Sequence, residues 1–212
     1  IPSEGPLILV CNHPFGILDG LLLGYLLSKR RNDFRIFAHH IFKGYDDLTN
    51  VILPINFDET REAVNQNIIT RGIALDYLKN GGCIGIFPGG TVSTAIKPFG
   101  QPIDPSWRRF TAKLVTKSDA RVLPVFFHGS NSRLFQIASH INQNLRLALL
   151  IREFKKHIDG KVSVSIGDLL PVNEIKNFCN TPHEMMQYLR DKTYSLSTTS
   201  NQNFEYGFDY DK

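Results

Sequence analysis

A histidine and an aspartate near the start of the chain have the residue types needed for proton transfer. His13 follows an apolar run and Asp19 comes six residues later, within residues 12–20, NHPFGILDG. An imidazole titrates near neutral pH and can accept a proton from a hydroxyl group. A carboxylate at its other ring nitrogen fixes the tautomer and stabilises the imidazolium. The sequence therefore predicts a general base, His13, oriented by Asp19. In the alternative interpretation, both residues only satisfy the start of a helix.

A glycine-rich turn is the second segment with chemical potential, because residues 87–93 are FPGGTVS. Gly89 and Gly90 allow a ligand to approach the backbone closely. Their amides, with the hydroxyl groups of Thr91 and Ser93, could bind an oxyanion or a phosphate. An ordinary tight turn is the structural alternative.

The remaining polar residues predict no metal site. His39 and His40 are adjacent but lack acidic partners at metal-ligand spacing. His128 follows a predicted strand, where its side chain either lines a pocket or only packs against neighbouring residues. The cysteines, which are scattered and predict neither a disulfide framework nor a zinc site, are Cys11, Cys83 and Cys179.

Other common catalytic patterns are missing from the sequence. Residues 129–132, GSNS, lack the flanks of a nucleophile elbow, which argues against a serine hydrolase. No phosphate-binding P-loop or dinucleotide fingerprint is present. Arg109, Lys113 and Lys117 share a helical face that is either solvated or in contact with an anionic lipid or carrier.

Short apolar runs predict the strands that must position these residues. Residues 7–11 and 83–87 are continuous apolar runs, which is typical of buried strands, and each leads directly into one of the two segments described above. Residues 121–127 contain Pro124, which indicates an edge strand or a bulge. The other predicted strands are residues 34–38, 51–55 and 161–166, while residues 145–151 fit either a strand or a helix.

Two helical patterns lie between the early strands. Residues 17–31 are apolar first and basic at their end, where cations suit the helix dipole. Residues 60–80 predict an amphipathic helix that two glycines stop. The residues expected to face the core from this second helix are Val64, Ile68, Leu75 and Leu78.

Two further helices are predicted from their first residues. Asp104 with Pro105 is typical of a cap, and the helix is expected to continue to residue 118. Residues 181–184, TPHE, form a capping box for a helix to about residue 195. The side chains expected to point inward from the first of these helices are Trp107, Phe110 and Leu114.

The alternation of strands and helices, without a repeat or a linker, predicts one α/β domain. We expect a mixed, mostly parallel sheet of about seven strands flanked by helices. Ligands of such sheets bind at the carboxyl ends of strands, where both chemical segments fall. The domain is expected to cover residues 1–196, without its upstream N-terminal segment, followed by a C-terminal tail at residues 197–212, loose from about residue 201.

Composition narrows the class of protein. The 212 residues are 42% hydrophobic and 21% charged, which excludes a disordered chain and allows a sizeable core. The net charge of +4 favours anionic partners such as phosphates, lipid headgroups or an acidic carrier. No apolar run approaches the roughly 20 residues of a membrane span, and no signal peptide is visible.

Residues 12–20 resemble motif I of the glycerolipid, or lysophospholipid, acyltransferase family. In most members four residues separate the histidine from the aspartate, whereas five separate His13 from Asp19. This longer spacing, with a following Asp-Gly, resembles the hemolysin-like branch. That branch includes proteins linked to the acylation of amino-acid lipids such as ornithine and glycine lipids.

Residues 87–93 resemble motif III of the same family, which is usually Phe-Pro-Glu-Gly-Thr-Arg-Ser. Gly89 stands where the family has the Glu, and Val92 where it has the Arg. In the family those two residues are associated with the glycerol phosphate of the acceptor. The resemblance therefore implies a different acceptor, unless Lys97 or Arg108 supplies the missing charge.

The resemblance extends from about residue 7 to about residue 170. Residues 121–129, RVLPVFFHG, resemble motif IV, and residues 104–107 and 129–132 also resemble the hemolysin-like branch. The motif II region falls at residues 34–43, although it cannot be matched residue by residue. The family fold is an α/β domain with a mixed sheet, in agreement with the pattern of elements.

The resemblance implies an O-acyltransferase that moves a fatty acyl group to the hydroxyl of a lyso-lipid. The acyl donor would be acyl-carrier protein or acyl-CoA, used as co-substrate, and no metal or other cofactor is expected. His13 and Asp19 would be the catalytic residues. The residues expected to contact substrate are Asn12, Pro88, Gly89, Gly90, Thr91, Ser93, Lys97 and Arg108.

The protein is expected to act peripherally at the cytoplasmic face of a bacterial inner membrane, without binding nucleic acid. The alternatives are a non-catalytic, membrane-active hemolysin-like protein and a conventional lysophosphatidic acid acyltransferase. The cations expected to contact anionic lipid are Lys29, Arg30, Arg31, Arg35, Lys43, Arg109, Lys113 and Lys117.

Overall fold

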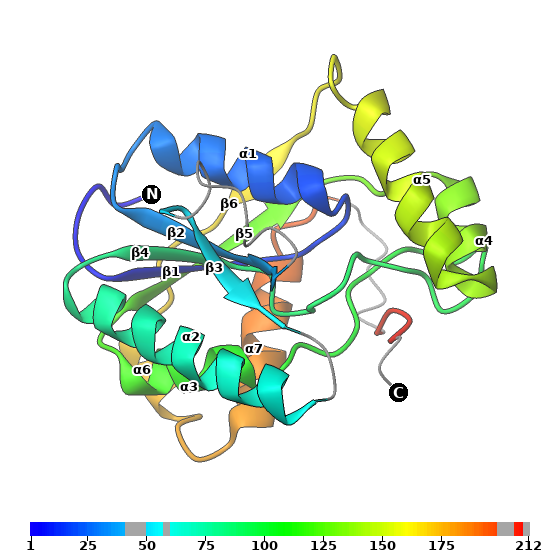
Figure 1. Ribbon diagram of the computed structural model, residues 1–212. Coiled ribbons are helices and arrows are strands. Elements are labelled where there is room, and N and C mark those ends of the chain that lie inside the picture. Colours follow the sequence, from blue (N-terminus) through cyan, green and yellow to red (C-terminus); the bar gives the residue numbers. More distant parts are fainter. Residues whose placement is uncertain (41–49, 57–59, 199–205, 210–212) are drawn as a thin grey trace.

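The structure is a computed structural model that describes residues 1–40, 50–56, 60–198 and 206–209. A central sheet carries helices on both faces (Figure 1). Its six strands have the order β3-β2-β4-β1-β5-β6, and only β6 is antiparallel to its neighbour. The strands are β1 (Leu7–Cys11), β2 (Phe34–His39), β3 (Ile52–Ile55), β4 (Cys83–Ile86), β5 (Arg121–Phe127) and β6 (Val164–Ile166).

The helices divide between the two faces of the sheet. One apolar cluster joins α1 to alternate residues of β1, and another joins α2, α3, α6 and α7 to the opposite face. All five residues of β1 are buried, as expected for a central parallel strand. The helices are α1 (Ile17–Ser28), α2 (Arg61–Lys79), α3 (Phe110–Lys117), α4 (Arg133–Ile141), α5 (Gln143–Lys156), α6 (Val172–Lys176) and α7 (Pro182–Tyr194).

The predicted mixed, mostly parallel α/β sheet is confirmed, with six strands instead of about seven. Residues 145–151, which fitted either a strand or a helix, belong to α5. Pro124 lies in a strand with neighbours on both sides, so β5 is not an edge. The ladder with β6 begins only at the next residue, Val125, so Pro124 itself lies just outside that pairing.

Two helix predictions were partly wrong. Of the four residues expected to face the core from α2, Leu78 is buried and Leu75 partly buried as predicted, whereas Val64 and Ile68 are not. In α2 the exposed fractions are 56% for Val64 and 49% for Ile68, and small residues such as Ala63 and Ala74 face the sheet instead. Small side chains let the helix approach the sheet closely, so its bulkier residues turn outward. Helix α1 ends at Ser28 because the chain then turns to bury Arg31.

Arg31 is therefore not a surface cation available to a membrane. Its guanidinium donates to both carboxylate oxygens of Asp33, at 2.8 and 2.7 Å, and to the carbonyl oxygens of Gly5 and Gly81. These bonds join three separate turns at one end of the sheet. Lys43, another predicted lipid contact, lies outside the described residues, as do residues 41–43 of the motif II region.

The helix predicted from Asp104 begins later, at Phe110, because the Asp104 carboxylate is used elsewhere. Trp107 and Leu114 are buried as predicted, and Phe110 is partly buried. Helix α7 begins with Pro182 after Thr181 as predicted, but the Thr181 side chain makes no capping hydrogen bond.

Part of the predicted loose tail is packed against the body. The amide of Gly207 donates to the carbonyl oxygen of Asp104 and that of Phe208 to Thr94, both at 2.9 Å. Residues 199–205 and 210–212 of the tail lie outside the described residues. Among the described residues, none of the helices combines the length and the hydropathy that a bilayer span requires.

The fold predicts that the three thiols differ sharply in reactivity. Burial raises the pKa of Cys83 to about 12 and that of Cys11 well above its ordinary value, whereas Cys179 is exposed. Because the thiolate is the reactive form, Cys179 alone should react promptly with Ellman's reagent at pH 8. Unfolding in guanidinium should release the other two. Prompt reaction of all three thiols in the native protein would contradict this packing.

Candidate active site

The carboxyl end of β1 positions the first candidate segment. Asn12 follows the strand directly and is buried. Its side-chain amide donates to the carbonyl oxygen of Phe127 at 2.9 Å, and its Oδ1 accepts the Phe127 amide at 2.7 Å. Asn12, predicted to contact substrate, thus extends the pairing of β1 with β5 and holds His13 at the edge of the sheet.

His13 and Asp19 are brought together as predicted. Nδ1 of His13 lies 3.0 Å from Oδ2 of Asp19, whose side chain is fully buried. The same oxygen accepts the amides of Phe15 at 2.8 Å and Gly16 at 2.9 Å. Asp19 therefore satisfies the start of α1 and pairs with His13 at once, so the catalytic and the structural interpretations describe one arrangement.

Burial sets the electrostatics of this pair. Loss of hydration raises the pKa of Asp19, and the hydrogen bonds from His13, Phe15 and Gly16 only partly offset that rise. With Nδ1 turned to Asp19, the imidazole has Nε2 available for a substrate. The ring stacks on Phe87, with centroids 4.4 Å apart, and the His13 side chain stays 19% exposed. The pair can thus accept a proton from a group that approaches Nε2.

The second candidate segment follows β4 and lies against the first. Gly90 has a φ of 72°, which favours glycine, and its amide closes a turn onto the carbonyl oxygen of Phe87. The Ser93 amide donates to the carbonyl oxygen of His13 at 2.8 Å. The two segments, 80 residues apart in sequence, are therefore hydrogen-bonded neighbours.

Asp104, which sequence analysis assigned to a helix cap, joins the two segments. Its Oδ1 accepts the His13 amide at 3.1 Å and the Ser93 hydroxyl at 2.5 Å, and its Oδ2 accepts Trp107 Nε1 at 2.9 Å. Asp104 is fully buried. This carboxylate also accounts for Gly89, because a Cβ on Gly89 would lie 3.3 Å from the Cβ and Cγ of Asp104. A longer side chain at position 89 would need Asp104 to move.

Arg146 is a site residue that the sequence analysis missed. It is buried on the inner face of α5, and its guanidinium donates to the hydroxyls of Thr94 at 2.7 Å and Thr91 at 3.1 Å. It also donates to the carbonyl oxygen of Val92 at 3.0 Å and to Ser139. Its isolated position in the apolar run LRLALLI was the signal that could have found it. A guanidinium therefore holds the turn at which Val92 replaces the family's usual Arg.

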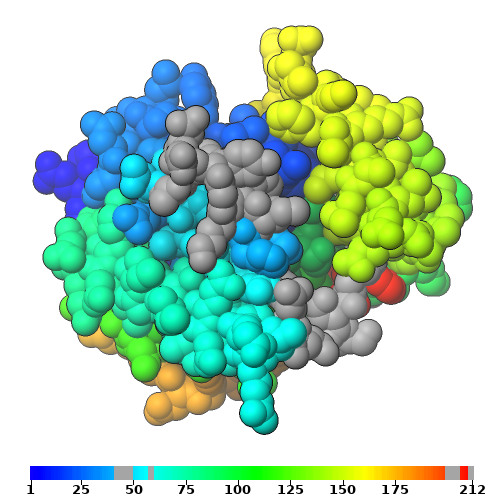
Figure 2. Space-filling view, viewed as in Figure 1, coloured from blue at the N-terminus to red at the C-terminus, as the bar shows by residue number. Residues whose placement is uncertain are grey.

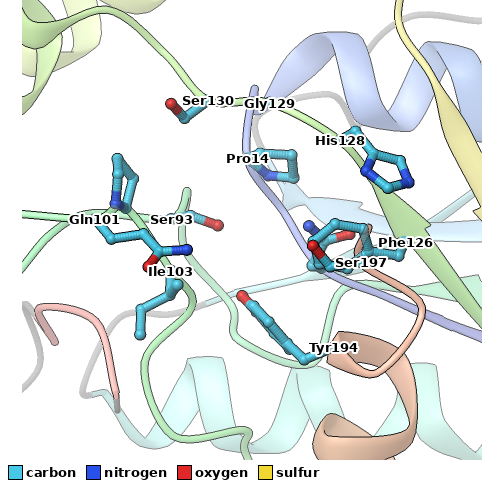
Figure 3. A pocket seen from close by; sticks show the side chains of 12 residues that line it. Pro14, Ser93, Gln101, Ile103, Phe126, His128, Gly129, Ser130, Tyr194 and Ser197 are labelled. Carbon is cyan, nitrogen blue, oxygen red and sulfur yellow. The ribbon is translucent and has the colours of Figure 1, made fainter. Parts of the chain in front are cut away.

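A cavity of about 240 Å³ lies at the carboxyl end of β1, where Pro14 lines it (Figure 3). The two residues that flank His13 in sequence contribute to its wall, whereas His13 itself does not. The wall includes Asn12, Pro14, Ser93, His128 and Tyr194. The Tyr194 side chain points into the space from the end of α7, toward Ser93. Burial raises the pKa of Tyr194 well above its ordinary value, so it stays a neutral hydroxyl. None of the residues that line this cavity is a lysine or an arginine.

A second cavity, of about 230 Å³, lies where the turn meets β3 and α2. It is lined by Phe87, Pro88, Gly90 and Arg108 together with apolar and amide side chains. The guanidinium of Arg108 reaches Asp209 of the C-terminal segment at 3.5 Å. Lys97, by contrast, is exposed and lines neither cavity.

The other polar candidates take up structural positions. His39 and His40 stack on one another at 4.5 Å, and His128 contacts the Ser165 hydroxyl at 2.7 Å while lining the first cavity. Within the described ranges, no three His, Cys, Asp or Glu side chains gather into a possible metal site. Arg109, which caps the start of α3, and Lys113 and Lys117 within that helix are all exposed.

Comparisons with known proteins identify the family of this chain. A family model described as Acyltransferase matches residues 2–202. The chain is similar to the lyso-glycine lipid O-acyltransferase of Phocaeicola vulgatus, with 26% identity over 92% of this chain and 70% of that protein. It is also similar to the lyso-glycine lipid O-acyltransferase of Bacteroides thetaiotaomicron, with 24% identity over 92% and 72%. Among solved structures, 1-acyl-sn-glycerophosphate acyltransferase PlsC from Thermotoga maritima matches 94% of this chain and 69% of its own, at 17% identity and a TM-score of 0.48.

The contacts of Arg146 predict a large effect on stability. Replacing Arg146 with Ala leaves several buried acceptors unsatisfied, so the free energy of unfolding should fall by about 2 kcal/mol or more. Arg146→Lys should recover only part of this, because an ammonium cannot reproduce the planar fork. Arg152, exposed on the same helix, is the matched control, and Arg152→Ala should cost less than about 0.5 kcal/mol. Equal urea midpoints for Arg146→Ala and Arg152→Ala would contradict the assignment.

Proposed function

The chain belongs to the acyltransferase family, and we propose that it transfers a fatty acyl group from a thioester to the hydroxyl of a lyso-lipid. The family favours an enzyme over the alternative of a non-catalytic, membrane-active protein. The observation that carries the proposal is the His13–Asp19 pair at the end of β1. His13 lies in sequence between Asn12 and Pro14, which line the first cavity, and its ring stacks on Phe87, which lines the second. The names of the two lyso-glycine lipid O-acyltransferases support a lyso-lipid acceptor.

Proton transfer by His13 forms the core of the proposed mechanism. Nε2 accepts the hydroxyl proton as the acceptor oxygen attacks the thioester carbonyl carbon. The tetrahedral intermediate then collapses, the carbon–sulfur bond breaks, and the imidazolium returns the proton to the leaving thiolate. No covalent intermediate on the enzyme is needed.

Asp19 stabilises the charge that forms on His13. A buried carboxylate has lost its hydration, so a positive charge only 3.0 Å away interacts with it more strongly than in water. The amides of Phe15 and Gly16 hold Asp19 in place before reaction. Asp19 therefore also fixes the tautomer that leaves Nε2 free of a proton.

The turn after β4 is the proposed site for the oxyanion. The Gly90 amide already donates to Phe87, so we assign the oxyanion to the amides of Gly89 and Thr91. Arg146 and Asp104 hold the two ends of this turn from opposite sides. The turn is thus rigid before the substrate binds, which lowers the cost of reorganisation during reaction.

We propose an amino-acid lyso-lipid as the acceptor. The printed names of the two relatives support it, as does the uncharged lining of the first cavity. Gly89 and Val92 replace the residues associated with glycerol phosphate in the family. The second candidate, lysophosphatidic acid, rests on Arg108, whose guanidinium lines the other cavity. The donor is proposed to be acyl-carrier protein or acyl-CoA, without a metal or other cofactor.

The cellular setting is proposed from the substrate. A lyso-lipid acceptor lies in a bilayer, so we propose that the protein works peripherally at the cytoplasmic face of the inner membrane. Its basic character suits anionic lipid and does not require a nucleic-acid partner. Of the cations predicted to contact lipid, those that remain exposed candidates are Lys29, Arg30, Arg109, Lys113 and Lys117, while Arg35 is only partly exposed.

Substitutions at the pair test the mechanism. His13→Ala should lower kcat by about 10²- to 10⁴-fold, the usual contribution of a general base. Asp19→Asn should lower kcat with little change in KM, because an amide oxygen can still accept the Phe15 and Gly16 amides while the negative charge is lost. Turnover is measured with a radiolabelled acyl donor and a panel of lyso-lipids. His183→Ala, at an exposed histidine of α7, is the control and should change turnover by less than about twofold. A folded His13→Ala protein with near wild-type kcat would exclude this mechanism.

A competition assay tests the acceptor. With lyso-glycine lipid and lysophosphatidic acid together, we expect transfer mainly to the amino-acid lipid, because the first cavity lacks the cation that fixes a phosphate. Arg108→Ala should leave that ratio unchanged, as should the control Arg109→Ala. Preference for lysophosphatidic acid that is abolished by Arg108→Ala or Lys97→Ala would establish the conventional acceptor instead.

A further inference from the structure

The α4–α5 hairpin exposes several large apolar side chains. The exposed fractions lie between 45% and 70% for five of them, although each is large and hydrophobic. The two helices form one shoulder of the molecule, coloured yellow-green in the space-filling view (Figure 2). These residues, here called the hairpin surface, are Leu134, Ile141, Leu145, Leu147 and Ile151.

Cations predominate along the α4–α5 hairpin. Arg152, Lys155 and Lys156 are exposed on α5. The only carboxylate between residues 133 and 158 is Glu153, which is buried, accepts hydrogen bonds from the Ser132 amide and hydroxyl, and pairs with Lys156 at 3.3 Å. Asp159, just beyond α5, is exposed, so Arg152 and Lys155 are the main cations that border the hairpin surface. An apolar face bordered by cations is the pattern of a helix that lies in the interface of an anionic bilayer.

Another helix shows apolar exposure without this charge pattern. Ile69 and Ile73 of α2 have exposed fractions of 65% and 47%. Helix α2 also carries the exposed acidic residues Glu62 and Asp76, so both signs of charge border its apolar residues. Charge complementarity to anionic lipid therefore favours the hairpin surface over α2.

The inner face of α5 lies directly on the candidate active site. Arg146 holds Thr91 and Val92 of the turn. Leu150 packs against Gly16, where an added Cβ would lie only 2.9 Å from its Cδ1. The His157 ring meets that of Phe15 with centroids 4.8 Å apart. One helix, about 10 Å in diameter, thus separates the hairpin surface from the segments that hold His13.

We propose that the hairpin surface docks the protein on an anionic lipid bilayer and brings the active site to the level of the headgroups. The docking has one consequence for catalysis, which rests on the proposed function: a lyso-lipid reaches His13 without leaving the membrane. The apolar side chains enter the headgroup region and the flanking cations contact lipid phosphates. The docking itself is independent of turnover.

Sedimentation with vesicles tests the docking directly. The 212-residue protein should bind vesicles of phosphatidylglycerol and phosphatidylcholine, and Leu147→Asp/Ile151→Asp should weaken that binding by about tenfold or more. The matched control is Ile69→Asp/Ile73→Asp, with the same spacing on the exposed face of α2, which should bind like the wild type. Equal binding by the wild type and the Leu147/Ile151 variant would overturn the proposal, as would an equal loss in the control.

A fluorescent variant gives a second readout. Trp107 is the only tryptophan and is buried, so it contributes a constant background. In Ile151→Trp the added emission should shift to the blue on vesicles and be quenched by lipids with brominated acyl chains. Emission that neither shifts nor is quenched while the protein sediments with vesicles would place the contact elsewhere and overturn the proposal.

Activity measurements separate this inference from the proposed function. In the Leu147/Ile151 variant, acyl transfer to a vesicle-embedded lyso-lipid should fall, while transfer to a water-soluble short-chain lyso-lipid stays within about twofold. Hairpin-dependent vesicle binding without any acyl transfer by the wild type would support the docking and refute the proposed function. A variant that keeps vesicle binding but loses affinity for acyl-carrier protein would assign the surface to the carrier and overturn the docking.

Discussion

The buried carboxylate of Asp104 is the interaction on which the arrangement of the site depends. An ionised carboxylate is costly to bury unless donors satisfy it. Here the donors are the amide of His13, the hydroxyl of Ser93 and the indole of Trp107. The Asp104 backbone is held in turn, since its amide donates to Tyr194 and its carbonyl oxygen accepts from Arg190 and Gly207. The segments after β1 and β4 must therefore converge at this carboxylate, together with the end of α7 and residues of the C-terminal segment.

The same carboxylate explains why the motif after β4 departs from its usual form. Asp104 lies against Gly89, and Arg146 contacts the backbone of Val92, so an acidic and a basic group are both present at the turn. Each comes from a distant part of the chain and is held by hydrogen bonds inside the protein. Both groups support the turn from behind and do not line the first cavity. The charges thus stabilise the scaffold, which is consistent with an acceptor that carries no phosphate.

Helix α5 connects the surface of the molecule to its chemistry. Its inner face carries Arg146 and Leu150, and its outer face carries Leu147, Ile151 and a row of cations. Glu153 ties α5 to the start of α4 through Ser132, so the two helices form one unit. Insertion of the outer face of α5 into a lipid interface therefore acts on the same helix that holds the turn after β4 through Arg146.

The sequence by itself determined the class of fold, most of the element boundaries and the His13–Asp19 pair. These features are local: a buried strand is a short apolar run, and Asp19 lies within the first turn of the helix that follows His13. The roles of Asp104 and Arg146 were decided only by the tertiary structure, because their partners lie 91 residues away at His13 and 55 residues away at Thr91. For the same reason Val64 and Ile68 of α2 were wrongly predicted to be buried, although Leu78 and, in part, Leu75 are, since periodicity shows which residues share a face but not exactly which part of that face meets the sheet. Sequence pattern records contacts within a few helical turns, whereas burial of a charged group depends on which distant donors the fold brings to it.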